Sequence, residues 1–182
     1  MDFIEGEDLR ARIDIQGILS DVDTVILGTA VCEALAYLHS RQPQVVHRDI
    51  KPGNIMILGG GLAKVMDFGI ARTAGGTKTR TGIIKGTPFY MSPEQANGQA
   101  VTEQSDLFSL GCVLYAMCTG RPPFRAETVA GAIRRTCEDT PRPIREVNPE
   151  MPDWLVEIIE RLLAKEPDDR FPSASEVSEL LG

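Results

Sequence analysis

Residues 47–54 read His-Arg-Asp-Ile-Lys-Pro-Gly-Asn, and residues 67–69 read Asp-Phe-Gly. Two short β-rich segments, 55–58 and 63–66, lie between these motifs, and three glycines separate them. Such a pattern is typical of a β-hairpin with a tight connection. Because the strands of a hairpin run side by side, we expect the end of the first motif and the start of the second to lie close together.

The two motifs carry the chemistry of a phosphate site. Asn54 and Asp67 offer hard oxygen ligands of the kind that Mg²⁺ prefers, and Mg²⁺ commonly binds substrate phosphates as well. Asp49 is a further carboxylate that could orient a hydroxyl proton, and Lys51 adds a positive charge between them. Phosphoryl transfer requires positioning and charge neutralisation of this kind. Each tripeptide alone is a weak indication, but the ordered set is specific.

Apolar residues at helical spacing predict that the rest of the chain is mainly helical. The predicted helices cover residues 9–17, 22–40, 102–117, 128–137, 154–165 and 173–181. The helix over 22–40 is expected to be capped by Asp21 or Asp23 and to bury an apolar stripe: Val22, Ile26, Ala30, Val31, Ala34, Leu35 and Leu38. The helix over 102–117 is apolar nearly all round, which predicts a central buried helix. Residues 45–46 are expected to be extended, 72–88 a long loop and 141–152 a proline-rich connector.

Composition excludes several function classes. The 182 residues carry a net charge of −7, which argues against binding to nucleic acid or an anionic membrane. The four cysteines form no C-x-x-C pair, so a zinc site is not expected. The acidic N-terminus does not resemble a signal peptide, and we expect no apolar stretch that approaches the roughly 18 residues of a membrane span. These features predict a reduced, cytoplasmic protein.

With these motifs, the whole chain resembles the protein kinase family, and specifically the bacterial eukaryotic-like (Hanks-type) serine/threonine kinases. The resemblance also includes a hinge-like N-terminus and the runs 86–88 (Gly-Thr-Pro), 92–94 (Ser-Pro-Glu), 105–111, 120–124 and 167–171. It implies an α+β, mainly α, kinase-like fold: a helical C-terminal lobe with a small β-hairpin beside the catalytic loop. The Gly-rich loop, strand lysine and helix glutamate of the family precede the hinge. We therefore expect the N-terminal β lobe to be absent and residues 1–182 to form a partial kinase domain.

The resemblance implies a role for each motif residue. Asp49 would be the catalytic base, Lys51 would contact the γ-phosphate of ATP, and Asn54 and Asp67 would hold Mg²⁺. Thr87 resembles the loop threonine that hydrogen-bonds near the catalytic aspartate and lysine. A lysine at position 51 is the form found in serine/threonine kinases rather than tyrosine kinases.

Further residues correspond to nucleotide-binding and structural positions of the family. Ile4 would offer its backbone N–H to adenine, and Met56 would lie below the base. His47 and Phe68 resemble packed residues of the internal spine, and Gly69 completes the Asp-Phe-Gly motif.

The activation segment of the family suggests regulation by phosphorylation. Thr79 and Thr81 match the pair that is autophosphorylated in bacterial relatives, and Arg48 would receive a phosphorylated residue. The alternative is that these threonines are simply solvated loop residues.

Three more positions resemble structural elements of the family. Glu94 and Arg170 match a buried ion pair that ties the activation segment to the helical lobe. Asp106 matches a residue that braces the backbone of the catalytic loop. Ser92 replaces an alanine of the family, a departure that we expect to affect no chemical group.

The sequence predicts a protein serine/threonine kinase that uses ATP and Mg²⁺ and takes protein substrates carrying Ser or Thr. With the N-terminal lobe expected to be absent, we expect that lobe or another protein to cover the hinge face of the chain. Two alternatives remain open: a non-catalytic kinase-like interaction module, and a small-molecule phosphotransferase of the aminoglycoside or choline type. The second usually lacks the Asp-Phe-Gly motif and the threonine-rich loop.

Overall fold

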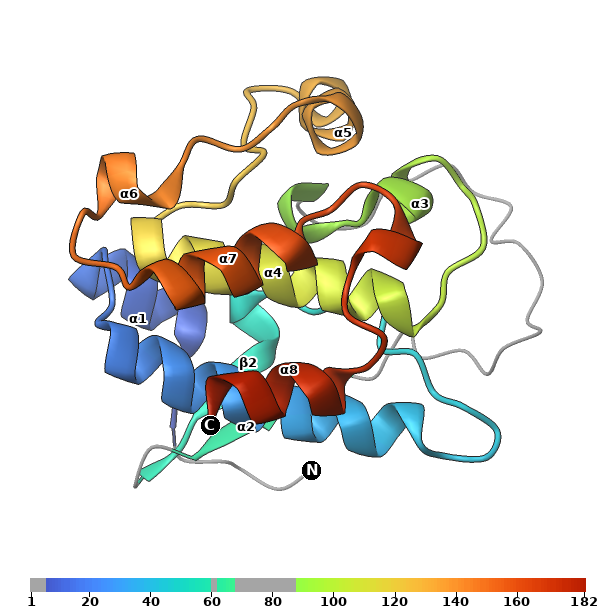
Figure 1. Cartoon of the computed structure of the whole chain (residues 1–182), viewed down its shortest axis with the longest axis horizontal. Coiled ribbons are helices and arrows are strands. Elements are labelled where there is room, and N and C mark those ends of the chain that lie inside the picture. Colours follow the sequence, from blue (N-terminus) through green and yellow to red (C-terminus); the bar gives the residue numbers. More distant parts are fainter. Residues whose placement is uncertain (1–5, 60–61, 68–87) are drawn as a thin grey trace.

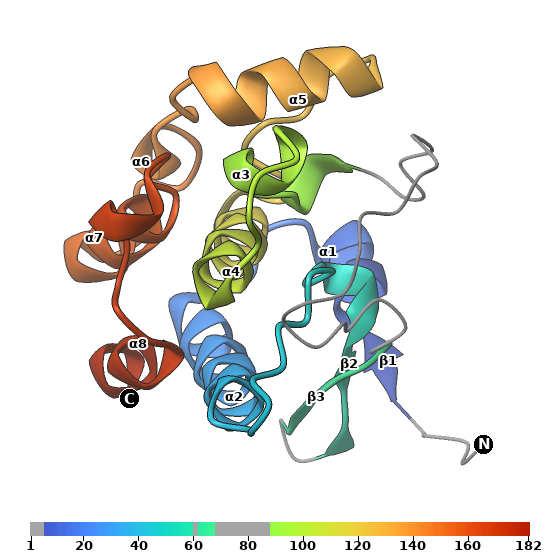
Figure 2. The ribbon, with the colours of Figure 1, turned by 90° about the vertical axis from the view of Figure 1, so that its right-hand side faces the viewer.

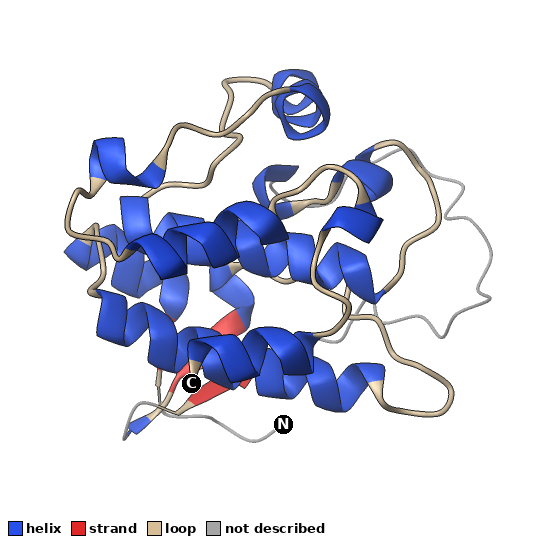
Figure 3. Ribbon diagram, in the orientation of Figure 1, coloured by secondary structure: helices blue, strands red, loops and turns tan. Residues whose placement is uncertain are grey.

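The computed structural model describes residues 6–59, 62–67 and 88–182, and all structural statements below refer to these. The described part is mainly helical with one small sheet (Figures 1 and 3). The α-helices are α1 (Leu9–Gln16), α2 (Asp21–His39), α3 (Pro93–Ala96), α4 (Glu103–Thr119), α5 (Val129–Glu138), α6 (Ile144–Val147), α7 (Asp153–Leu162) and α8 (Ala174–Leu181). The 3₁₀ turns are η1 (Pro52–Asn54), η3 (Pro88–Tyr90) and η4 (Pro167–Asp169). The fold class predicted from the sequence is therefore confirmed.

Helix α4 forms the centre of the helical part. Every residue from Ser105 to Thr119 is buried, as the apolar sequence predicts. Thr102 caps its N-terminus by accepting a hydrogen bond from the N–H of Gln104, and Gly120 ends it in the left-handed conformation, with φ of 77°. Figure 2 shows α4 between α7 on one side and α2 below, and both helices pack against it.

Helix α2 buries a different face from the predicted one. Val31 and Leu35 are buried as expected, but Val22 and Ile26 are 60% and 48% exposed. The reason is that α4 and α8 both pack at Gly28, where an added Cβ would lie 2.9 Å from Leu114 and 3.2 Å from Leu181; Figure 1 shows α8 along α2. A small residue permits this close approach, so the contact turns the buried face toward Gly28.

Two other details of α2 differ from expectation. Ser20, rather than an aspartate, caps the helix by accepting a hydrogen bond from the N–H of Asp23. Helix α2 also holds an 18-residue window with a mean hydropathy of 1.3, so by length and composition it could cross a membrane. The expectation that no stretch reaches this length is wrong for α2. The core helix of a soluble protein passes the same test, and α2 packs against α4, α8 and β3.

The sheet has three antiparallel strands: β1 (Glu7–Asp8), β2 (Ile55–Ile57) and β3 (Ala63–Val65). The predicted hairpin is formed by β2 and β3, in which Ile55 faces Val65. Strand β1 adds to the free edge of β2, a pairing that its two residues did not predict. The segment 45–46 forms no strand among the described residues, and the connector 141–152 contains the short helix α6.

Candidate functional site

Three side chains of the first motif form one hydrogen-bonded group. The Asp49 carboxylate accepts a hydrogen bond from Lys51 Nζ at 2.7 Å and one from Asn54 Nδ2 at 3.0 Å, both on Oδ2. Asn54 Nδ2 also donates to the backbone oxygen of Asp49, at 2.8 Å. Both donors use the same carboxylate oxygen, and no described residue donates to Asp49 Oδ1, which can accept a further hydrogen bond.

The hairpin brings the second motif beside this group, as the sequence predicts. The backbone N–H of Met66 donates to the Asn54 oxygen at 2.7 Å, so Asp67 follows directly on a contact with Asn54. The His47 ring contacts the Met66 oxygen through Nε2, at 3.0 Å. Asp67 itself is exposed, which leaves its carboxylate accessible from solvent.

Two residues of the site adopt the left-handed backbone conformation. Arg48 has φ of 69° and Asp67 has φ of 58°, and these are the only described non-glycine residues with positive φ. The conformation is costly for L-residues and persists only where surrounding contacts hold it. Aspartate tolerates this conformation better than most residues, but the residue type of Arg48 does not predict it.

Asp106, at the start of α4, holds the strained loop. Its buried carboxylate accepts hydrogen bonds from the backbone N–H groups of His47 and Arg48, each at 2.8 Å. A ring nitrogen of His39, Nε2, lies 2.9 Å from Asp106 Oδ2. Asp106 therefore braces the backbone of this loop, as expected from the sequence. His39 was not a candidate, since a histidine in the last turn of a helix carries no distinctive pattern.

Gln95 is a second residue that sequence reasoning missed. Its Nε2 donates to the backbone oxygen of Arg48 at 2.9 Å, so α3 also fixes the strained residue. Ser92 and Gln95 form a capping box, with the Ser92 hydroxyl accepting from the Gln95 N–H and the Gln95 oxygen accepting from the Ser92 N–H. The expectation that the serine affects no chemical group is therefore wrong. A Ser-x-x-Gln spacing was visible in the sequence and would have revealed the cap.

A buried ion pair joins α3 to the segment before α8. Arg170 donates to both oxygens of Glu94, at 2.8 and 3.0 Å, and also to the backbone oxygens of Ala164, Gln104 and Lys165. Burial acts to raise the pKa of Glu94, but hydrogen bonds from Arg170 and Ser105 outweigh it, so the pKa lies below its ordinary value. The pair predicted from the sequence is thus formed, with a guanidinium whose hydrogen bonds are well satisfied.

Comparison with known proteins agrees with this geometry. The family model described as "Protein kinase domain" matches residues 1–180. The chain belongs to the protein kinase family.

Bacterial serine/threonine kinases are among its close relatives. It is 42% identical over 181 residues to the probable serine/threonine-protein kinase PknB of Bifidobacterium longum, and 40% identical over 184 residues to PknB of Mycolicibacterium smegmatis. It is 38% identical over 180 residues to a probable serine/threonine-protein kinase of Streptomyces coelicolor. Each alignment covers 97% of this chain but only 26%, 28% and 26% of the relative, so the chain spans about a quarter of these proteins.

Several kinase positions lie outside the described residues. These are Ile4, Phe68, Gly69, Thr79, Thr81 and Thr87. Met56, the residue expected below adenine, is half-buried in β2, where it pairs with Asp8 on one side and Lys64 on the other.

The residues that are described fit an Mg²⁺ ion bound together with phosphates. Asn54 directs its amide nitrogen to Asp49, which leaves the amide oxygen as the atom available to a ligand. Asp67 lies just after the end of β3, the strand that pairs with β2 next to Asn54. Among the described residues no group of three or more His, Cys, Asp or Glu could hold a metal. A site of one carboxylate and one amide oxygen suits Mg²⁺, which retains waters and takes substrate phosphates as ligands.

Proposed function

We propose that this chain carries the catalytic centre of a protein serine/threonine kinase, which transfers the γ-phosphoryl group of Mg-ATP to Ser or Thr of protein substrates. The observation that supports it best is the Asp49 carboxylate, held on one oxygen by Lys51 and Asn54. A carboxylate fixed in this way can receive a substrate hydroxyl on its other oxygen. The family and the relatives support the same chemistry.

Each residue has a distinct task in this proposal. Asp49 Oδ1 accepts the hydrogen bond of the incoming hydroxyl and aligns its oxygen for attack. Lys51, close to Asp49, moves toward the γ-phosphate and balances its charge. Asn54 and Asp67 would hold Mg²⁺, which when bound neutralises the negative charge of the phosphates. Asp106 contributes by holding the loop backbone, so that these side chains are placed before substrate binds.

The remaining positions follow the family pattern. Ile4 and Met56 would contact adenine, and Thr87 would hydrogen-bond near Asp49. Arg48 would bind phosphorylated Thr79 or Thr81. In support of a phosphate partner, Arg48 Nε is buried and has no hydrogen-bond partner among the described residues.

The test separates binding from transfer. We expect Asn54→Ala and Asp67→Asn to weaken Mg²⁺-dependent binding of a fluorescent ATP analogue, whereas Asp49→Asn leaves it nearly unchanged. In the same chain, Asp49→Asn should abolish transfer of ³²P from ATP to an unstructured Ser/Thr-rich protein. Equal loss of binding in all three variants would contradict the separate roles of base and metal ligands. A folded chain with no Mg-ATP binding would favour a non-catalytic interaction module.

A further inference from the structure

A groove at the end of α4 is lined by positive charge, although the chain as a whole is acidic. It has a volume of about 690 Å³ and lies between the end of α4, the segment 121–128, Arg135 of α5 and the residues Arg142 and Val147. Six arginines fall between residues 121 and 145, against three acidic residues, in a chain with a net charge of −7. Four of them line the groove together with one acidic residue, Glu127; these are Arg121, Arg125, Arg135 and Arg142.

Two of these arginines carry no compensating charge. Arg135 pairs with Asp139 at 3.2 Å, and Arg142 pairs with Glu146 at 3.0 Å. Arg121 and Arg125 are exposed and form no salt bridge with any described residue. The groove therefore presents guanidinium groups that are free to bind carboxylates, for which their planar fork is suited.

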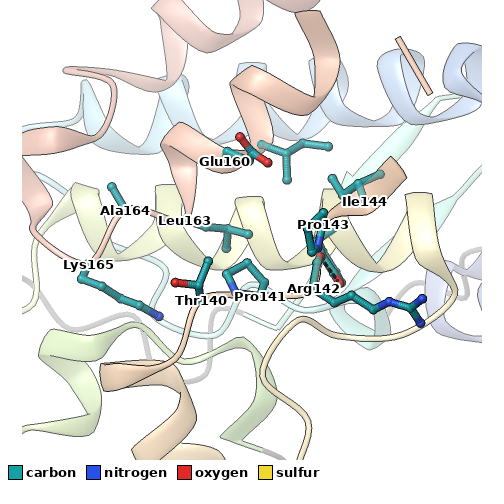
Figure 4. Close-up of a pocket in the computed structure, with 11 residues that line it drawn as sticks. Thr140, Pro141, Arg142, Pro143, Ile144, Glu160, Leu163, Ala164 and Lys165 are labelled. Atoms are coloured by element: carbon teal, nitrogen blue, oxygen red, sulfur yellow. Dashed lines mark hydrogen bonds between the residues drawn. The ribbon is translucent and has the colours of Figure 1, made fainter. Parts of the chain in front are cut away.

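The walls of the groove are fixed by hydrogen bonds. The Tyr115 hydroxyl donates to the backbone oxygen of Arg142 at 2.8 Å, and Arg135 Nη1 donates to the backbone oxygen of Arg125. Figure 4 shows the neighbouring cavity of about 340 Å³, in which the Arg142 guanidinium points away from Leu163 and Lys165. Its charge is thus not directed into that cavity. A preformed wall lowers the cost of ordering when a ligand binds.

The lining of the groove also contains apolar residues. Pro122, Pro123, Ala126 and Val147 lie among the arginines. A mixed surface of this kind fits a peptide with acidic side chains around an apolar residue better than it fits a uniformly charged backbone.

The groove is also connected to the proposed catalytic loop. Helix α5 packs against α3 and η3, and Gln95 of α3 donates to the backbone oxygen of Arg48. Figure 2 shows α3 between α5 and the part of the chain that contains the catalytic loop. Helix α5, which contributes Arg135 to the groove, therefore packs on the short helix that contacts the proposed catalytic loop.

We propose that this arginine groove binds an acidic segment of the protein substrate, apart from the phosphorylated residue. This inference rests on the proposed kinase function, for which it names a class of substrate. By holding such a segment, the groove would raise the local concentration of the substrate hydroxyl near Asp49.

The test measures peptide binding without ATP, so that it does not depend on phosphotransfer. The probe is a fluorescein-labelled 12-residue peptide with four Glu around two Leu, compared with the same peptide carrying Gln for Glu. We expect Arg121→Glu/Arg125→Glu to weaken anisotropy-measured binding of the acidic peptide by about tenfold or more, and added salt to weaken binding to the unaltered chain. The Arg41→Glu/Arg134→Glu variant makes the same charge change at exposed arginines outside the groove and should bind nearly as well as the unaltered chain.

Other results would overturn the proposal. Equal binding of the Gln peptide would exclude recognition of acidic groups, and equal loss in both double variants would indicate non-specific attraction. Tighter binding of a 12-nucleotide single-stranded DNA would identify a nucleic-acid site. Dimerisation that depends on Arg121 and Arg125, seen by light scattering, would assign the groove to a second copy. If the peptide binds as expected but the chain transfers no phosphate to a Ser/Thr-rich protein, the kinase proposal fails while the groove stands.

Discussion

The Lys51–Asp49 and Arg170–Glu94 pairs join the same kinds of charge at nearly the same distance, 2.7 and 2.8 Å, in very different surroundings. The side chains of Lys51 and Asp49 are 29% and 31% exposed, whereas those of Arg170 and Glu94 are 0% and 6% exposed. Water screens the charges of the first pair, so this pair contributes little to stability. Its partial exposure also keeps its atoms accessible to a substrate. The second is shielded from water, so its loss would leave a buried charge.

The comparison separates a buried region that stabilises the fold from the accessible region to which we assign the proposed chemistry. Around Arg170, the hydrogen bonds of the ion pair are satisfied by α3, α4 and the segment before α8. Around Asp49, two backbones are strained and one carboxylate oxygen is left open. Asp106 links the two regions, because it begins the buried helix and holds the strained loop. Strain at a functional site requires such support from the rigid part of the molecule.

Breaking the buried pair should have the largest effect. We expect Arg170→Met to reduce the free energy of unfolding by about 3–5 kcal/mol, because Glu94 would remain buried without its partner. Urea denaturation of the purified chain measures this. The control is Arg10→Met, which removes an exposed pair with Asp14 and should cost less than about 1 kcal/mol. Similar losses in both variants would show that burial does not distinguish the two pairs.

Substituting Asp106, which links the two regions, should have the next largest effect on stability. Two backbone N–H groups and His39 face the Asp106 carboxylate. Asp106→Asn replaces one of its acceptor oxygens by an NH₂ donor, so at least one of these contacts is lost. We expect a loss of about 1–3 kcal/mol in the free energy of unfolding. Hydrogen exchange should show faster exchange at His47 and Arg48 than in the unaltered chain. Unchanged protection there would contradict the bracing role of Asp106.

The buried Glu94 should also make the stability of the chain depend on pH. Because the pKa of Glu94 is lowered in the folded chain, the unfolded chain binds more protons between that pKa and the ordinary value near 4.5. Stability from this group is therefore present above about pH 4.5 and is lost as the pH falls through the lowered pKa. Urea midpoints between about pH 3 and pH 7 should fall less steeply on acidification for Glu94→Gln than for the unaltered chain. An identical slope would be inconsistent with a lowered Glu94 pKa.

The smallest effect on stability is expected in the accessible pair. Asp49→Asn should change the free energy of unfolding by no more than about 0.5 kcal/mol, because its partner Lys51 is solvated and asparagine still accepts from Asn54. The same substitution should abolish phosphotransfer. A large loss of stability would place Asp49 in the structural region instead.

The sequence predicted the elements that depend on local pattern. The central helix, the β2–β3 hairpin and the neighbourhood of Asn54 and Asp67 were foreseen because apolar spacing and glycine-rich turns are local properties. It did not predict the buried face of α2, which depends on how closely α4 and α8 approach Gly28. It also missed Gln95 and His39, because a single polar residue in a helix has no pattern that indicates its distant partner.

By itself, the order of residues in the motifs determined the family and the set of candidate groups, since these depend only on which side chains occur and in what order. Only the tertiary structure decided which oxygen of Asp49 is free, that Arg48 and Asp67 adopt positive φ, and that arginines far from those motifs gather around one groove. These features arise where segments distant in sequence meet: their hydrogen bonds offset backbone strain, and their packing sets which charges remain unpaired.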